Sequence, residues 1–176
     1  RLADETTRLQ RLVNDLQELS KLEAGYLPIQ VQAVDLCPLL EGVVRIFTDQ
    51  FASKDGVTLR LDCPPDLPTP LADPARVKQV LINLVSNALR YTSEGSVTLT
   101  VWSSNKRVYV RVTDTGIGIA EDDLPNVFER FWRADRSRNR TSGGTGLGLT
   151  ICRRLVKIQG GEITVQSQVG QGSEFT

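Results

Sequence analysis

The hydrophobic pattern begins with a predicted helix from Arg1 to about Ala24. Its apolar residues recur close to heptad spacing, and Gly25 is a suitable stop. Because this seam is narrow, we expect the helix to pack on helices outside this sequence or on a second copy; a core helix of the same domain is the alternative. The chain has no Met and begins inside the pattern, so it reads as a piece of a longer protein. The seam consists of Leu2, Leu9, Leu12, Val13, Leu16, Leu19 and Leu22.

The following segments switch between strand and helix patterns. Residues 27–34 alternate between apolar and polar side chains and predict a strand. Asp35 is a suitable cap for a helix to about Lys54, and a turn then leads into a short predicted strand at 57–61. Prolines make residues 64–70 a stiff connector to the next helix.

The central helix is announced by Asp73 as N-cap and Pro74 at the first helical position. It carries two asparagines on one face, although asparagine usually favours caps and turns. Amide oxygens can ligate Mg²⁺ and arginine can meet a phosphate, so this face predicts a site for a metal-bound polyphosphate; a solvated face is the alternative. The polar residues in question are Asn83, Asn87, Arg90 and Tyr91.

Two alternating segments, 96–102 and 107–113, predict a hairpin around a four-residue turn at 103–106. The second strand runs directly into Asp114, followed by two glycines within residues 114–119. A carboxylate here lies at the mouth of a sheet, and glycines let the backbone approach a ligand closely. An adenine amino group is a natural donor to this carboxylate, whereas a plain tight turn is the alternative.

The last third contains a glycine-rich stretch, 143–149, that opens a predicted helix at 149–158. Free backbone N–H groups at such a helix start can bind phosphate oxygens. The spacing matches neither the dinucleotide fingerprint nor a Walker loop, and a flexible surface loop is the alternative. Two segments precede the glycines: an aromatic and basic one at 127–133 and an arginine-rich one at 134–142. After the helix, strands are predicted at 162–167 and from Gly172 onward.

Composition mainly excludes functions. The 21 basic and 21 acidic side chains give no net charge, hence no general reason to expect nucleic acid or an anionic membrane as partner. The chain has no histidine, which excludes Ser-His-Asp and Cys-His catalysis and leaves no plausible zinc set. Cys37, Cys63 and Cys152 are widely spaced, so we expect inert thiols in a reduced, cytoplasmic setting; a redox-sensing thiol is the alternative.

Four motifs in this order resemble the boxes of bacterial sensor histidine kinases. They are the N box Asn83-x-x-x-Asn87-Ala88, the first glycine box at 114–118, the F box at 128–131 and the second glycine box at 144–149. Residues 172–175 are similar to the last short motif of the family, and residues 15–25 to the second helix of its dimerisation and phosphoacceptor hairpin. The resemblance covers essentially the whole chain.

The resemblance implies an α+β fold: a two-layer α/β sandwich of the Bergerat type. Helices would cover one face of a mixed, mainly antiparallel sheet, and a further helix would precede it. Residues 1–25 would belong to the hairpin and residues 26–176 to the catalytic ATP-binding domain, with a truncated last strand. ATP and Mg²⁺ are the implied cofactors. The implied location is cytoplasmic, without membrane contact by this piece, including as the cytoplasmic part of a membrane-anchored sensor.

Carried over by position, Asn87 is implied as the principal Mg²⁺ ligand, with Asn83 assisting. Arg90 would face phosphate, and these three would form the catalytic set. Tyr91 would line the adenine pocket, and Asp114 would accept a hydrogen bond from the adenine amine. The segment between the glycine boxes would form the ATP lid. The other implied cofactor-binding residues are Gly116, Gly118, Ile119, Gly144, Thr145, Gly146, Leu147, Gly148 and Leu149.

The amide at Asn83 separates this chain from the gyrase, mismatch-repair and chaperone ATPases, which resemble it but carry glutamate there. An amide cannot act as a general base at neutral pH, which favours transfer to a neutral imidazole over hydrolysis. The resemblance implies as partners the phosphoacceptor hairpin of the same kinase, a second subunit and the receiver domain of a response regulator. The phosphoacceptor histidine is absent, so this piece should not phosphorylate itself. The alternatives are a regulatory nucleotide-binding module without transfer activity and a hydrolytic ATPase.

Overall fold

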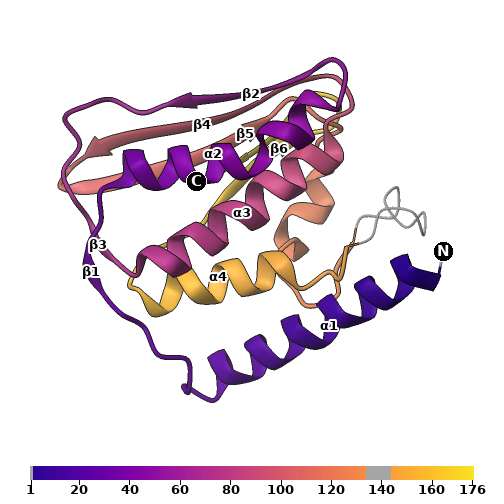
Figure 1. The fold of residues 1–176 in the computed structure, drawn as a ribbon, viewed down its shortest axis with the longest axis horizontal. Coiled ribbons are helices and arrows are strands. Elements are labelled where there is room, and N and C mark those ends of the chain that lie inside the picture. The colour runs from indigo at the N-terminus through magenta and orange to yellow at the C-terminus, as the bar shows by residue number, and fades with distance from the viewer. Residues whose placement is uncertain (1, 134–143) are drawn as a thin grey trace.

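The computed structural model describes residues 2–133 and 144–176 and forms two layers (Figure 1). A five-stranded sheet makes one layer, in the spatial order β2-β4-β5-β7-β6. Only β2 and β4 are parallel, and every other neighbouring pair in this sheet is antiparallel. The strands in that order are Val57–Asp62, Gly95–Ser104, Arg107–Asp114, Gly172–Phe175 and Val165–Gln168. A separate ribbon pairs β1 (Gln32–Ala33) with β3 (Leu71–Ala72).

Three helices cover one face of the sheet, and a fourth lies outside them (Figure 1). The covering helices are α2 (Leu36–Ala52), α3 (Pro74–Tyr91) and α4 (Gly148–Ile158), and α1 (Leu2–Glu23) runs along α4. A short 3-10 helix, η1 (Glu121–Asn126), follows the central hairpin. The α+β sandwich predicted from the sequence is confirmed. None of the helices in residues 2–133 and 144–176 is both long and apolar enough to cross a membrane.

The core lies between the covering helices and the sheet. Apolar side chains of α2, α3 and α4 meet the inward-facing residues of β4 and β5, which alternate along each strand with more exposed residues. Removing this apolar surface from water is the main driving force for the fold. Fully buried members include Leu40, Val43, Val85, Val97, Leu99, Ile151 and Leu155.

Asp73 fixes the start of α3, as predicted. Its carboxylate accepts hydrogen bonds from the backbone amides of Ala75 and Arg76, and from the distant amide of Gln30. The bond from Gln30, together with those from Arg76 and Ala75, lowers the pKa of Asp73 below 3.8 despite its burial. The ionised carboxylate therefore stabilises the fold above pH 3.8, and this contribution is lost as the pH falls through the lowered folded pKa.

Three of the predicted strand boundaries are wrong, and the one predicted at 162–167 is β6 at Val165–Gln168. Instead of a strand over 27–34, only Gln32–Ala33 pairs, because its partner β3 is also two residues long. The hairpin between β4 and β5 closes on two residues, Asn105 and Lys106, rather than on four. Both have positive φ (49° and 61°), which is the conformation of the tightest hairpin turns.

The apolar seam of α1 is divided between two environments. Leu19 and Leu22 are buried in the core of this chain, so the core-helix alternative holds for the last turns. Leu9, Val13 and Leu16 are exposed, and the packing of this part of the seam on a further helix stays a prediction. The boundary between residues 1–25 and 26–176 stays a prediction.

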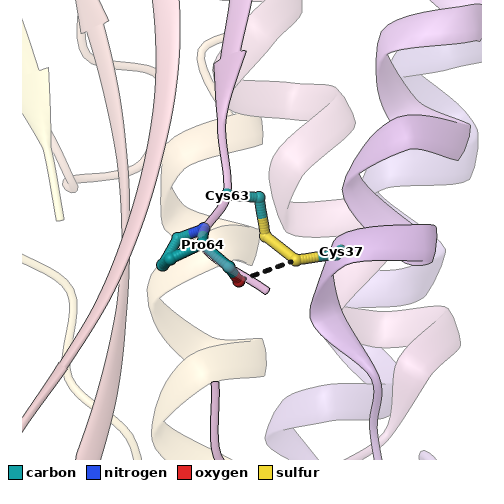
Figure 2. Close-up of a disulfide and its surroundings, with 3 residues drawn as sticks. All are labelled: Cys37, Cys63 and Pro64. Atoms are coloured by element: carbon teal, nitrogen blue, oxygen red, sulfur yellow. Dashed lines mark hydrogen bonds between the residues drawn. A yellow bond between two sulfur atoms is a disulfide. The ribbon is translucent and has the colours of Figure 1, made fainter. Parts of the chain in front are cut away.

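The expectation of three inert thiols is wrong for two cysteines. Cys37, in the first turn of α2, forms a disulfide with Cys63, directly after β2 (Figure 2). The pattern gave no indication because the two residues are 26 positions apart and meet only when α2 packs against β2. Cys152 remains a free, buried thiol, and burial raises its pKa from 9.0 to about 12. Such a thiol is unreactive.

Opening the disulfide should lower the free energy of unfolding by about 3 kcal/mol, because the closed loop restricts the unfolded chain. Urea unfolding of the oxidised protein, the reduced protein and the Cys37→Ser/Cys63→Ser variant measures this. Reduced protein and variant should unfold at the same, lower urea concentration, and reductant should not change the variant. An unchanged midpoint on reduction of the unmutated protein would contradict the prediction.

Candidate nucleotide site

A cleft of about 500 Å³ lies where α3, the start of α4 and the segment after β5 meet. Its size is in the range of small-molecule and cofactor sites. The cleft brings together residues that are far apart in the sequence, from Arg11 in α1 to Phe175 in β7. Twelve of the fourteen predicted site residues line it: Asn83, Asn87, Arg90, Tyr91, Asp114, Gly118, Ile119, Gly144, Thr145, Gly146, Gly148 and Leu149.

Asp114 forms one end of the cleft. It is the last residue of β5, its side chain is 7 % exposed, and the backbone amides of Gly116 and Ser173 donate hydrogen bonds to its carboxylate. Burial raises the pKa of Asp114 above 3.8, against the opposing effect of these two bonds. A buried carboxylate with remaining acceptor capacity is suited to a neutral donor such as an aromatic amine.

The first glycine segment, which is the first glycine box at residues 114–118 with Ile119, is held between α3 and the β6–β7 turn. Gly116 is not on the cleft wall, because it packs against the backbone carbonyl of Tyr91, 2.3 Å from where a Cβ would be. Gly118 is on the wall and packs with the same closeness against the Gln168 carbonyl. Ile119 also lines the cleft, and its amide donates to the Ser167 hydroxyl. The segment is therefore fixed by backbone contacts on both sides.

The polar face of α3 forms the long wall of the cleft. Asn83, Asn87, Arg90 and Tyr91 are all half-buried there, as the helical spacing predicted. Asn83 lies beside the start of α4, where a Cβ at Gly148 would be 3.8 Å from its amide carbon. The amides of Asn83 and Asn87 are oxygen donors of the kind that Mg²⁺ accepts, so the residues present fit this ion.

The second glycine segment, which is the second glycine box at residues 144–149, leads into α4 at the other end of the cleft. Thr145 donates a hydrogen bond from its hydroxyl to Asp15 (2.7 Å) and accepts one from the Leu147 amide. Leu147 itself is fully buried in the core and does not reach the cleft. Gly148 is the first residue of α4, so the unpaired N–H groups and positive dipole end of this helix lie at the cleft. This end is suited to an anion.

Several lining residues were missed in the sequence. Arg11 and Asp15 reach the cleft from α1, one helical turn apart, and Phe47 reaches it from α2. Ser173 and Phe175 lie in the short last motif, which was noticed but given no role. Only the spacing of Arg11 and Asp15 could have indicated a shared helix face. The arginine-rich segment with Arg136, Arg138 and Arg140, predicted as part of a lid, lies outside the described residues.

Comparison with known proteins agrees with this geometry. Residues 72–176 match the family of histidine kinase-, DNA gyrase B- and HSP90-like ATPases. The chain is 40 % identical over 176 residues to the circadian input-output histidine kinase CikA of Synechococcus elongatus, covering 98 % of this chain and 23 % of CikA. The chain thus spans about a quarter of the length of this relative.

Solved structures of histidine kinases share the fold. Full-length ShkA, solved in complex with AMPPNP, has a TM-score of 0.85 and 36 % identity, over 95 % of this chain and 34 % of ShkA. The catalytic domain of ThkA has a TM-score of 0.71 and 30 % identity, over 83 % of this chain and 92 % of that domain. ThkA has also been solved in complex with the response regulator protein TrrA; this match has a TM-score of 0.77 and 26 % identity, over 98 % of this chain and 47 % of ThkA.

The motifs, the sandwich and the cleft therefore agree with the comparisons. The chain belongs to the histidine kinase-, DNA gyrase B- and HSP90-like ATPase family, as an ATP-binding catalytic domain of the sensor histidine kinase type.

Proposed function

We propose that this chain binds Mg·ATP in the cleft and transfers the γ-phosphoryl group to a histidine on a hairpin helix of the full-length protein. The observation that carries the proposal is the convergence of Asp114, the asparagine face of α3 and the start of α4 on one cleft. A carboxylate that can accept a hydrogen bond lies at one end and suits adenine. A helix start that can bind anions lies at the other end and suits the phosphates.

The cleft orients the nucleotide in one direction. The adenine amine donates to Asp114, beside the ring of Tyr91, and the phosphates extend toward Arg90 and the start of α4. Arginine can bind phosphate oxygens through two N–H groups at once. The complex of the related ShkA with AMPPNP supports an adenine nucleotide as ligand.

Asn87 and Asn83 are the residues that would hold Mg²⁺, together with phosphate oxygens and water. Mg²⁺ commonly takes only one or two protein ligands when it binds with a nucleotide, so two amides suffice. Bound there, the ion would neutralise charge on the phosphates during transfer.

Transfer needs no base from this domain. The neutral imidazole nitrogen attacks the γ-phosphorus, an N–P bond forms, and the bond to the bridging oxygen breaks, so that ADP leaves. Asn83 cannot abstract a proton from water, which disfavours hydrolysis. The domain acts by positioning the phosphates and stabilising their charge, through Arg90 and the amides at the start of α4.

The proposal also covers the location and the partners of the full-length protein. This protein would be a cytoplasmic or membrane-anchored dimer with its ATP site in the cytoplasm, where ATP is found. It would pass the phosphoryl group to an aspartate of a response regulator. The complex of the related ThkA with TrrA supports that partner.

The proposal is tested by supplying the missing acceptor. The domain is joined to a hairpin with one histidine and incubated with ATP labelled at the γ-phosphate. A label that is acid-labile, base-stable and lost on His→Gln supports the proposal. The chain as it stands, without histidine, should retain none. Tight ATP binding without transfer to the hairpin would instead indicate a regulatory nucleotide-binding module.

A further inference from the structure

Helix α1 contributes charged side chains to the nucleotide cleft, although it lies outside residues 72–176, which match the ATPase family. Arg11 and Asp15 both line the cleft. Four residues apart on a helix, they share a face and are separated by one turn of about 5.4 Å along the axis. The cleft is therefore closed on one side by an element that the family match does not include.

Polar contacts hold α1 in this position. The Asp15 carboxylate accepts a hydrogen bond from Thr145 in the second glycine segment. Glu18, one turn later, pairs with Arg76 (3.3 Å) and with Gln79 (2.8 and 2.7 Å) of α3. These contacts join α1 to the second glycine segment and to the first turns of α3.

The end of α1 is fastened separately. Glu23 pairs with Arg130 and lies 3.6 Å from Arg154 of α4, while Leu19 and Leu22 are buried in the core. The helix is thus anchored along its second half by apolar and charged contacts. The anchoring of the second half helps to position the first half, which includes Arg11.

Arg11 places a guanidinium on the cleft wall. Within the part of the chain that the structure describes, it makes no hydrogen bond or ion pair, whereas Arg8 pairs with Glu5. It is exposed and yet lies on the cleft wall. A guanidinium without a partner beside an anion-binding helix start has an unused capacity for phosphate.

The position of Arg11 selects one phosphate. Asp114 marks the adenine end, and Thr145, bonded to Asp15, marks the opposite end of the cleft. Arg11 lies one turn before Asp15 on the same face of α1, on the side of the cleft that α1 closes. Because the proposed phosphates extend from adenine toward this side, the terminal phosphate is the one that Arg11 can meet.

We propose that Arg11 is a phosphate-binding residue that contacts the terminal phosphate of ATP and thereby makes the site prefer ATP over ADP. The inference rests on the proposed function, because it presupposes adenine nucleotide in the cleft. It assigns to α1 a direct part in nucleotide selection, in addition to its contacts with the domain.

The test compares ATP and ADP binding by calorimetry, with Mg²⁺, in three variants of the present chain. Arg11→Ala should weaken ATP binding about tenfold and ADP binding less than twofold. Arg11→Lys should recover part of the ATP affinity, since a lysine keeps the charge but not the two-pronged contact. Arg8→Ala is the matched control: it removes the same charge from the same helix and should change neither affinity.

The result that overturns the inference is an Arg11→Ala variant with unchanged ATP affinity, or one that loses ATP and ADP affinity equally. Failure of the proposed function looks different, because the unmutated chain would then bind neither nucleotide. Arg11 is exposed and unpaired within the described residues, so the variant should fold, which an unchanged melting temperature confirms.

Discussion

Replacing Asp114 with asparagine should weaken ATP binding by about tenfold to a hundredfold. The carboxylate is buried at the end of the cleft, where a hydrogen bond to a charged acceptor contributes roughly 1.5–3 kcal/mol. Asparagine can still accept from the Gly116 amide, but it presents a weaker, uncharged acceptor to adenine. Calorimetric titration with ATP measures the change. Asp122→Asn, on the exposed η1 helix, is the control and should bind ATP normally.

The stability of the chain should depend on pH through Asp114, and Asp114→Asn should remove this dependence. The folded pKa of Asp114 lies above its unfolded value of 3.8, because burial penalises the charged form. Between the two values the folded state holds more protons, so this residue favours folding more as the pH falls and costs stability at neutral pH. Without nucleotide, Asp114→Asn should therefore be at least as stable as the unmutated chain at pH 7. A large loss of stability would show that the weaker binding comes from a damaged fold.

Acid should also weaken ATP binding, since a protonated Asp114 loses its charge. The loss should set in at a higher pH than for an ordinary aspartate, and Asp114→Asn should be insensitive over that range. A variant with the same acid dependence as the unmutated chain would exclude Asp114 as the titrating group.

Replacing Gly118 with alanine should destabilise the fold by about 4 kcal/mol or more and abolish nucleotide binding. The φ of Gly118 is +68°, a conformation that alanine rarely adopts. In addition, a Cβ would lie 2.0 Å from the Gln168 carbonyl, so either the first glycine segment or the β6–β7 turn must move. Because Gly118 lines the cleft, this movement distorts the adenine end.

Gly170→Ala separates the two causes. Gly170 has a similar φ of +79°, but nothing lies within 4 Å of where its Cβ would be. Its substitution should therefore cost only about 1–2 kcal/mol and leave nucleotide affinity unchanged. Urea unfolding and ATP titration of both variants measure the difference. Equal effects at the two positions would contradict the role given to the close contact with Gln168.

The sequence predicted best those elements that have a capping residue at their start and regularly spaced apolar residues. Helix α3 is the best case, because Asp73 and Pro74 define its first turn and its apolar residues keep one face toward the core. The same spacing placed Asn83 and Asn87 on one face, and this face lines the cleft. Contacts between distant segments left no such signal. The Cys37–Cys63 disulfide depends on how α2 packs against β2, and a cysteine spacing alone does not show it.

In the candidate site, too, residues in local patterns were predictable and residues brought in by contacts between distant segments were not. Asp114 was predictable because a strand ending in a carboxylate before glycines has a local pattern, and Leu147 was carried over by motif position, although its side chain turns into the core. Arg11 and Asp15 could not be assigned, since their approach to the cleft follows from the docking of α1 on α3 and α4. Only that docking distinguishes them from other polar residues of a helix surface.

The most direct test of the Mg·ATP site is a calorimetric titration of the chain with ATP, with and without Mg²⁺, beside Asn87→Ala. Asn87 is half-buried on the cleft wall, and its amide is an available oxygen ligand for the ion. The account predicts tight binding that requires Mg²⁺, and at least about tenfold weaker binding in Asn87→Ala. Affinity that is independent of Mg²⁺, or unchanged in Asn87→Ala, would contradict it.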